Sequence, residues 1–195
     1  MSCFTPGTLI ATPKGERKVE ELRAGDRVVT RDNGIRKLSW TGRRRVSARQ
    51  MARAGHLQPI LIRAGALDFE LPERDMLVSP NHRVLVASDQ TALYFEEREA
   101  LAAAKHLTGL VGILRAELPE ISYIHIAFDT HEVVLSDGAW SECFQPADPS
   151  RTGVGGGNAQ RTELYELFPA FKTRQSPMPA RMPRAREGVD LRLSI

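Results

Sequence analysis

The sequence predicts an all-β domain with a short appendage. Its apolar runs are short, rich in β-branched residues, and separated by Gly, Pro, Asn and Asp turn signals. A helical spacing of apolar residues occurs in one stretch of this region, residues 92–107. A chain of 195 residues with 42% hydrophobic residues suits one globular domain with a sizeable core. We therefore predict a β-domain over residues 1–148 and an appendage over residues 149–195.

The first strands are predicted from hairpin signals. Residues 8–12 form a β run that Pro13, Lys14 and Gly15 close with a turn. The Asp32-Asn33-Gly34 sequence is the strongest hairpin signal in the chain, and it separates apolar runs over 27–30 and 35–40. Polar and small residues then lead to the next run. We predict further strands over 58–63, 83–87, 110–114 and 121–128, and a turn at Ser136-Asp137-Gly138.

Helices are expected in two places. Residues 92–107 form one inserted helix that connects strands on the surface. After a Gly-rich linker, residues 162–171 form a C-terminal helix whose apolar stripe docks on the β-domain. The basic, Pro- and Arg-rich tail beyond it is expected to be largely disordered.

Strand alternation places polar side chains together on the last predicted strands. His82 shares a strand face with Val84 and Val86, so it points where buried valines point. Between residues 124 and 131 the apolar residues fall on one face, and the other face carries His125, Asp129 and His131. A polar row of this kind faces something other than the main core.

Four ordered motifs resemble the Hint (Hedgehog/intein) domain, most closely the bacterial Hint-type proteins of the second class. They are Cys-Phe-Thr-Pro-Gly-Thr from Cys3, Leu-Arg-Ala-Gly-Asp-Arg-Val from Leu22, Ser-Pro-Asn-His-Arg-Val-Leu from Ser79 and Phe-Asp-Thr-His-Glu-Val-Val from Phe128. The resemblance implies an all-β horseshoe of two pseudo-symmetric halves. In such a fold the first and last strands meet at a central active site.

The resemblance also implies autocatalytic, single-turnover cleavage before Cys3. The Cys3 thiolate attacks the Ser2 carbonyl, and this N-to-S acyl shift converts the amide into a thioester. A protonated His82 gives its proton to the departing amide nitrogen, with the Ser79 hydroxyl polarising the same bond. His131 assists the second half of the reaction. From strand alternation, Asp129 or His125 accepts the thiol proton.

Two departures from the intein pattern define the expected outcome. Glu142 stands at the position that matches the terminal asparagine of inteins, so we expect cleavage by water or another nucleophile without full splicing. Cys143 could accept the acyl group from Cys3, although we expect its side chain to be a small buried hydrophobe. Met1 and Ser2 alone precede Cys3, so the natural substrate, an upstream polypeptide of the same precursor, is absent or truncated.

Two other functions remain open from the residues alone. Cys3, His82, His131 and Cys143 form a Cys2His2 set that could bind zinc, although their spacing is unlike a compact zinc finger. The chain could also be a catalytically silent module that binds a partner. The self-processing chemistry needs no cofactor or metal.

Composition limits the partners and the compartment. The net charge of +3 lies largely in Arg43-Arg44-Arg45 and the C-terminal arginines, and aromatics are not interleaved with them, so we expect no nucleic-acid binding. Two cysteines form no disulfide framework, and no leader or membrane-spanning run is present. A cytoplasmic location is the default, with part of a secreted precursor as the alternative. The oligomeric state is not indicated.

Overall fold

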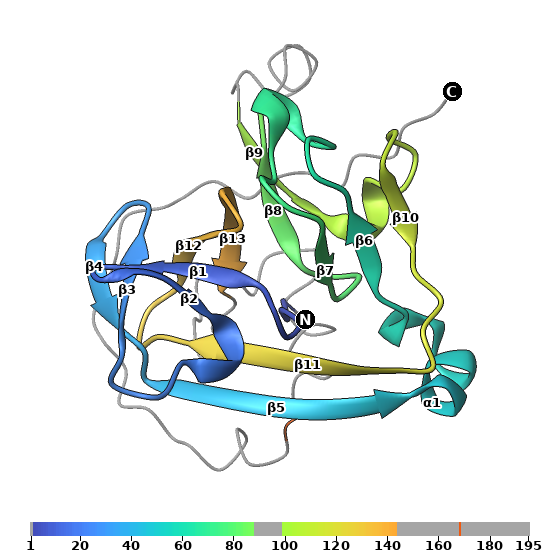
Figure 1. Ribbon diagram of the computed structural model, residues 1–195, viewed down its shortest axis with the longest axis horizontal. Helices are drawn as coiled ribbons and strands as arrows, with labels where there is room; N and C mark the ends of the chain where they lie inside the picture. The colour runs from blue at the N-terminus through green and yellow to red at the C-terminus, as the bar shows by residue number, and fades with distance from the viewer. Residues whose placement is uncertain (1, 88–98, 144–167, 169–195) are drawn as a thin grey trace.

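The computed structural model describes residues 2–87, 99–143 and 168, and these are mostly β-strands (Figure 1). The all-β prediction is confirmed. The strands are β1 (Leu9–Thr12), β2 (Gly15–Lys18), β3 (Arg27–Thr30), β4 (Gly34–Lys37), β5 (Trp40–Ser47), β6 (Ile60–Ile62), β7 (Met76–Val78), β8 (Arg83–Val86), β9 (Ala100–Ala103), β10 (Ile113–Arg115), β11 (Glu120–Ala127), β12 (Glu132–Ser136) and β13 (Ala139–Cys143). Among the described residues the α-helix is α1 (Ala48–Arg53), and short 3-10 turns are η1 (Val19–Glu21), η2 (Gly55–Leu57), η3 (Asp68–Glu70) and η4 (Ala104–His106).

The strands pair across long sequence distances. One sheet runs in the order β2-β1-β12-β13-β8-β9, with β3 also pairing to β12 and β4 to β3. A second sheet runs β10-β6-β7, and β11 pairs with β5 along eight residues from each strand. In Figure 1 the β5–β11 ribbon runs along one side of the molecule, and the other strands rise above it. The first strand therefore lies beside the last strands of the domain.

Two hairpins form where the turn signals predicted them. The β3–β4 hairpin closes around residues 31–33, with Thr30 opposite Gly34. The β12–β13 hairpin closes through Asp137 and Gly138, whose φ values of 45° and 81° fit a type I′ turn. The Asp137 carboxylate also accepts a hydrogen bond from the Leu9 N–H at 3.1 Å. This turn therefore fastens the end of the domain to β1.

Strand β11 divides two parts of the core. Ile124, Ile126 and Phe128 pack into a cluster with Phe4 and residues of β1, β3 and β12. Tyr123, on the opposite face of the strand, packs with Cys3 and Val46 instead. A third cluster fills the space between β6, β7, β8 and β10. The predicted alternation holds along β11, and its odd-numbered face looks toward Cys3.

The predicted helix over residues 92–107 is wrong where it can be checked. Residues 100–103 form β9, which pairs antiparallel with β8 and places Leu101 opposite Leu85. Hydrogen bonding to an available strand edge overrides the helix propensity of the alanine run. Residues 88–98 lie outside the described part of the chain. The α-helix that the structure contains, α1, begins instead with a Ser47–Gln50 capping box.

The predicted C-terminal helix and the Gly-rich linker lie outside the described residues, except for Phe168. Its side chain is buried and makes an edge-to-face contact with Trp40, at a centroid distance of 5.5 Å. This residue belongs to the predicted apolar stripe, and it does pack on the β-domain. Within the described parts of the chain, no helix has the length and apolar character needed to cross a membrane.

Candidate active site

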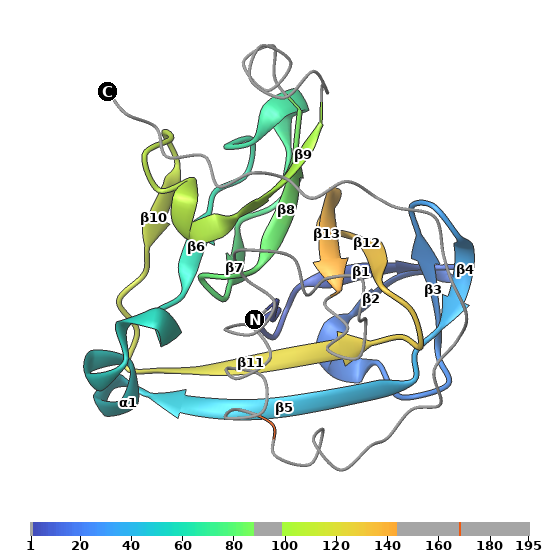
Figure 2. The same cartoon turned by 180° about the vertical axis from the view of Figure 1, so that it is seen from behind.

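The N-terminal segment runs between β7 and β11 in the middle of the molecule, where both views place the start of the chain (Figure 1, Figure 2). The Phe4 N–H donates to the Ile124 carbonyl at 2.9 Å, and the Ile124 N–H donates back at 2.8 Å. On the other side the Ser79 N–H donates to the Cys3 carbonyl at 3.1 Å. These bonds hold the Ser2–Cys3 peptide in the interior, with Cys3 fully buried.

Both polar atoms of the Ser2–Cys3 peptide bond have side-chain partners. The Cys3 N–H donates to Ser79 Oγ at 3.0 Å. The Ser2 carbonyl oxygen lies 2.7 Å from His125 Nδ1. A carbonyl oxygen only accepts, so Nδ1 carries the proton in this contact. One amide is therefore held at its nitrogen by a hydroxyl and at its oxygen by an imidazole.

The same His125 nitrogen also faces the cysteine thiol. Cys3 Sγ lies 3.9 Å from His125 Nδ1, a long contact that is weaker than the bond to the carbonyl. The His125 ring is bordered by Trp40 and Phe168, at centroid distances of 6.0 and 6.2 Å. His125 is therefore placed to interact with the thiol and with the carbonyl that the thiol would attack.

His82 is buried next to this site, and the geometry corrects its expected charge. Its ring packs edge-on against Phe4 at a centroid distance of 4.6 Å, and neither ring nitrogen has a hydrogen-bond partner among the described residues. Burial lowers the pKa of His82 from 6.5 to about 3, although the Glu142 carboxylate opposes the shift and His125 adds to it. The expected resting imidazolium is therefore replaced by a neutral imidazole.

His131 and Glu142 form a pair on the β12–β13 side. His131 Nε2 lies 3.0 Å from Glu142 Oε1. The Glu142 side chain is fully buried, whereas the His131 side chain is 20% exposed. The other carboxylate oxygen, Oε2, accepts a hydrogen bond from Ser2 Oγ at 3.4 Å and lies 3.9 Å from Arg83 Nε. The residue before the candidate nucleophile is thus connected to His131 through one carboxylate.

Asp129 is the predicted site residue that the structure does not bring to Cys3. Strand β11 ends at Ala127, so the alternation that placed Asp129 beside His125 stops before it. Asp129 lies exposed in the following bend and makes no hydrogen bond or ion pair with any described residue. Of the two candidates for the thiol proton, His125 faces the thiol, but its Nδ1 already carries a proton toward the Ser2 carbonyl, so this nitrogen acts as a hydrogen-bond donor and does not accept the thiol proton.

Cys143 is buried in the apolar cluster that contains Phe4 and Val134. Burial raises the pKa of its thiol well above the ordinary value, and the nearby Glu142 and Glu132 carboxylates and Cys3 raise it further. This thiol stays protonated and packs as a small hydrophobe. Among the described residues no group of three or more His, Cys, Asp or Glu could hold a metal ion, so the four residues considered for zinc are not gathered into a site.

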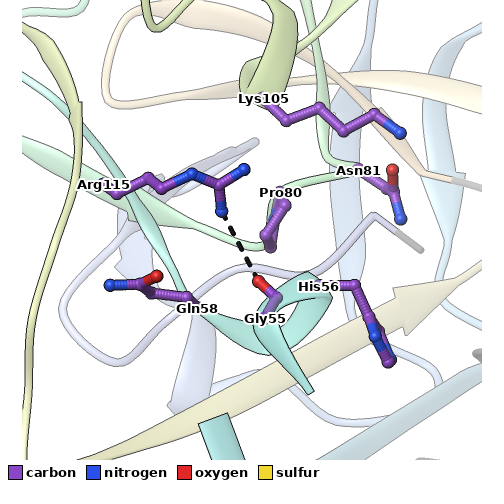
Figure 3. A pocket seen from close by; sticks show the side chains of 7 residues that line it. All are labelled: Gly55, His56, Gln58, Pro80, Asn81, Lys105 and Arg115. Carbon is purple, nitrogen blue, oxygen red and sulfur yellow. Dashed lines mark hydrogen bonds between the residues drawn. The ribbon is translucent and has the colours of Figure 1, made fainter. Parts of the chain in front are cut away.

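A pocket of about 420 Å³ lies on the outer side of the Pro80-Asn81 turn (Figure 3). Lys105 and Arg115 extend over it, and the Arg115 guanidinium donates to the Gly55 carbonyl at 3.5 Å. The remaining lining residues are His56, Gln58, Pro80 and Asn81. None of the predicted site residues lines this pocket.

Comparison of the sequence with known protein families identifies the family of this chain. The chain matches the Hint domain family over residues 2–148, and it therefore belongs to that family. As a Hint domain, it is of the self-processing type. No curated protein is similar enough in sequence to count as a match.

Solved structures of inteins and intein-like domains are similar to this chain. A triply substituted variant of the gp41-1 intein shares 14% identity at a TM-score of 0.45, covering 72% of this chain and 98% of its own. A splice-inactive, glutathione-linked variant of the AceL NrdHF class 3 split intein shares 14% identity at a TM-score of 0.48, covering 73% of this chain and 98% of its own. A bacterial intein-like domain from Clostridium thermocellum shares 14% identity at a TM-score of 0.43, covering 74% of this chain and 99% of its own.

Proposed function

We propose that this Hint domain cleaves the Ser2–Cys3 peptide bond by an N-to-S acyl shift and does not complete splicing. The observation that carries the proposal is the pair of contacts on that one amide. Ser79 Oγ accepts the Cys3 N–H at 3.0 Å, and His125 Nδ1–H donates to the Ser2 carbonyl at 2.7 Å. The Cys3 sulfur lies beside the same His125 nitrogen. A structural role alone does not require a nucleophile at this point.

The first step moves one proton and exchanges one bond. Cys3 Sγ bonds to the Ser2 carbonyl carbon, and negative charge develops on the carbonyl oxygen. The His125 N–H stabilises that charge, because a hydrogen bond to an anion is stronger than one to a neutral carbonyl. The C–N bond then breaks, and the proton lost by the thiol is delivered to the Cys3 nitrogen. Ser79, whose hydroxyl already contacts that nitrogen, positions it.

His82 acts in this proposal as a transient proton carrier. With a pKa of about 3, its imidazole is protonated in roughly one molecule in ten thousand at pH 7. Once protonated, however, it is a much stronger acid than an α-ammonium group, whose pKa is about 8. Transfer to the departing amine is therefore strongly downhill. In this role His82 receives its proton during the reaction and does not hold it in the resting protein.

A fusion experiment tests the proposal. A folded reporter is placed upstream of Ser2 in the full chain, and hydroxylamine or a small thiol is added to intercept the thioester. We expect a reporter that carries the added nucleophile at its C-terminus and a fragment that begins at Cys3, both identified by mass spectrometry. Cys3→Ala removes the acyl acceptor and should abolish the reaction. His82→Ala should slow it on the order of a hundredfold, the usual scale for a general acid.

The matched control for His82 is His56→Ala, because His56 is exposed and lies outside the site. It should cleave at the parent rate. If the reporter of the folded parent stays uncut, or if Cys3→Ala is cut as fast as the parent, the self-processing proposal is wrong. The chain would then be a catalytically silent Hint module.

A further inference from the structure

Glu142 is a buried charge that contacts none of the atoms that react in the first step and acts on that step only through the pKa of His82. Its side chain is fully buried, and an isolated carboxylate in such a position is strongly unfavourable. Its partners include His131 at 3.0 Å, Ser2 at 3.4 Å and Arg83 at 3.9 Å. His131 and Ser2 belong to the candidate active site. The carboxylate therefore does more than satisfy a neighbouring arginine.

The contact with Glu142 defines the tautomer of His131. A carboxylate only accepts hydrogen bonds, so His131 Nε2 carries a proton toward Oε1. The other ring nitrogen, Nδ1, is then able to accept a proton. A carboxylate that orients a histidine in this way makes it a better general base.

His131 is also the site histidine that solvent can reach. Its side chain is 20% exposed, whereas Cys3, His82 and His125 are fully buried. Water cannot approach the Cys3 sulfur without passing a packed side chain. Water therefore reaches the site most readily on the side of His131.

We infer that Glu142 is a positioning residue for the second step, hydrolysis of the thioester. One of its oxygens orients His131, and the other holds the Ser2 side chain, so the base and the acyl group are kept on the same side of the site. This inference rests on the proposed function, because hydrolysis requires the thioester formed in the first step.

The hydrolysis balances without any co-reactant other than water. The water oxygen bonds to the Ser2 carbonyl carbon while one of its protons passes to His131 Nδ1. The bond between that carbon and Cys3 Sγ then breaks. The departing thiolate receives the proton back from His131. The products are an upstream polypeptide that ends in a Ser2 carboxylic acid and a domain that begins with a free Cys3 amine and thiol.

Two rates measured on the same fusion protein separate the two steps. Release induced by hydroxylamine reports thioester formation, and release in buffer alone reports hydrolysis. For Glu142→Gln we expect hydrolysis to slow on the order of a hundredfold, because the charge that orients His131 is lost. Induced release should change far less than hydrolysis, because Glu142 acts on thioester formation only through the pKa of His82. Glu142→Asp, which keeps the charge, should restore part of the hydrolysis.

The matched control is Glu132→Gln, which removes a buried carboxylate of β12 whose partners are Asn33, Thr130 and Arg36. It should leave the ratio of the two rates unchanged. His131→Ala changes a partly exposed residue and should slow hydrolysis as Glu142→Gln does. The double variant should be no slower than His131→Ala alone, because the two residues act as one unit.

The outcomes distinguish failure of this inference from failure of the proposed function. If the parent shows no induced release, the thioester proposal itself fails. If Glu142→Gln lowers both rates equally, or leaves hydrolysis unchanged, the inference is overturned while the thioester proposal stands. The same holds if the effects of Glu142→Gln and His131→Ala multiply in the double variant. If Glu142→Gln does not fold, His131→Ala decides, since unchanged hydrolysis there removes the base that Glu142 would orient.

Discussion

Acid should destabilise this domain through His82. The folded protein holds the imidazole neutral, with its pKa lowered from 6.5 to about 3, whereas the unfolded chain titrates at the ordinary value. Between pH 6.5 and pH 3 the unfolded state therefore binds a proton that the folded state does not. The contribution of neutral His82 is intact above pH 6.5 and is lost as the pH falls toward 3. Over this window the loss is about 4 to 5 kcal/mol.

That loss is large compared with a typical unfolding free energy of about 5 to 15 kcal/mol. The assay compares urea unfolding of the parent and of His82→Asn at pH 7 and pH 4. The parent should lose about 3 kcal/mol more than the variant across this interval. Other titrating groups, such as Asp137, whose pKa is raised chiefly by burial, affect both proteins alike and cancel in the difference.

His56→Asn is the control for the acid experiment, because its imidazole is exposed and lies outside the site. The unfolding free energy of this variant should change between pH 7 and pH 4 by the same amount as that of the parent. If His82→Asn shows the same pH dependence as the parent, then His82 is not held neutral by burial. In that case the transient-carrier role would have to be replaced by a resting imidazolium, and the description of the first step would change.

Two further predictions concern packing beside the site. Phe168→Ala should lower the unfolding free energy by about 2 to 4 kcal/mol, because a buried ring that contacts Trp40 is lost, whereas Phe69→Ala at an 81% exposed position should cost far less. Equal effects in thermal unfolding would contradict the described packing of Phe168. Cys143→Ala should lower the unfolding free energy by about 1 kcal/mol and leave hydroxylamine-induced release unchanged, because Cys143 is a packing residue. A large loss of release in a folded Cys143→Ala variant would instead make Cys143 part of the chemistry.

The sequence predicted the parts of the fold that local chemistry determines. The turns at residues 31–33 and 137–138 follow from Asn, Asp and Gly, whose backbone conformations suit tight hairpins. Strand β5 was missed because residues 40–47 carry Arg43-Arg44-Arg45 and no apolar alternation. They form a strand because β11 offers eight backbone partners. Such pairing depends on the rest of the fold and has little local signal.

In the candidate site, too, the features with a local sequence signal were predicted and those that depend on the rest of the fold were not. Cys3, Ser79, His82 and His131 were predicted from motifs, and the structure places Ser79 against the Cys3 amide. The contact of His125 with the Ser2 carbonyl was not predicted, because it depends on how the N-terminal segment pairs with β11. The buried contact of Glu142 with His131 was not predicted, because a glutamate is usually exposed. Its place at the position that matches the terminal asparagine of inteins was the available signal.

In the proposed reaction, the two contacts on the Ser2–Cys3 amide differ in what they contribute to the rate. Ser79 accepts the Cys3 N–H in the resting state, and this bond stabilises the intact amide as much as it orients it. The His125 contact is different, because its acceptor changes from a neutral carbonyl to an oxyanion as the sulfur adds. A hydrogen bond to a charged group is stronger than a neutral one by about 1 kcal/mol or more, and only interactions that strengthen in the transition state accelerate the chemistry. The catalytic advantage of this site therefore lies mainly at the carbonyl oxygen.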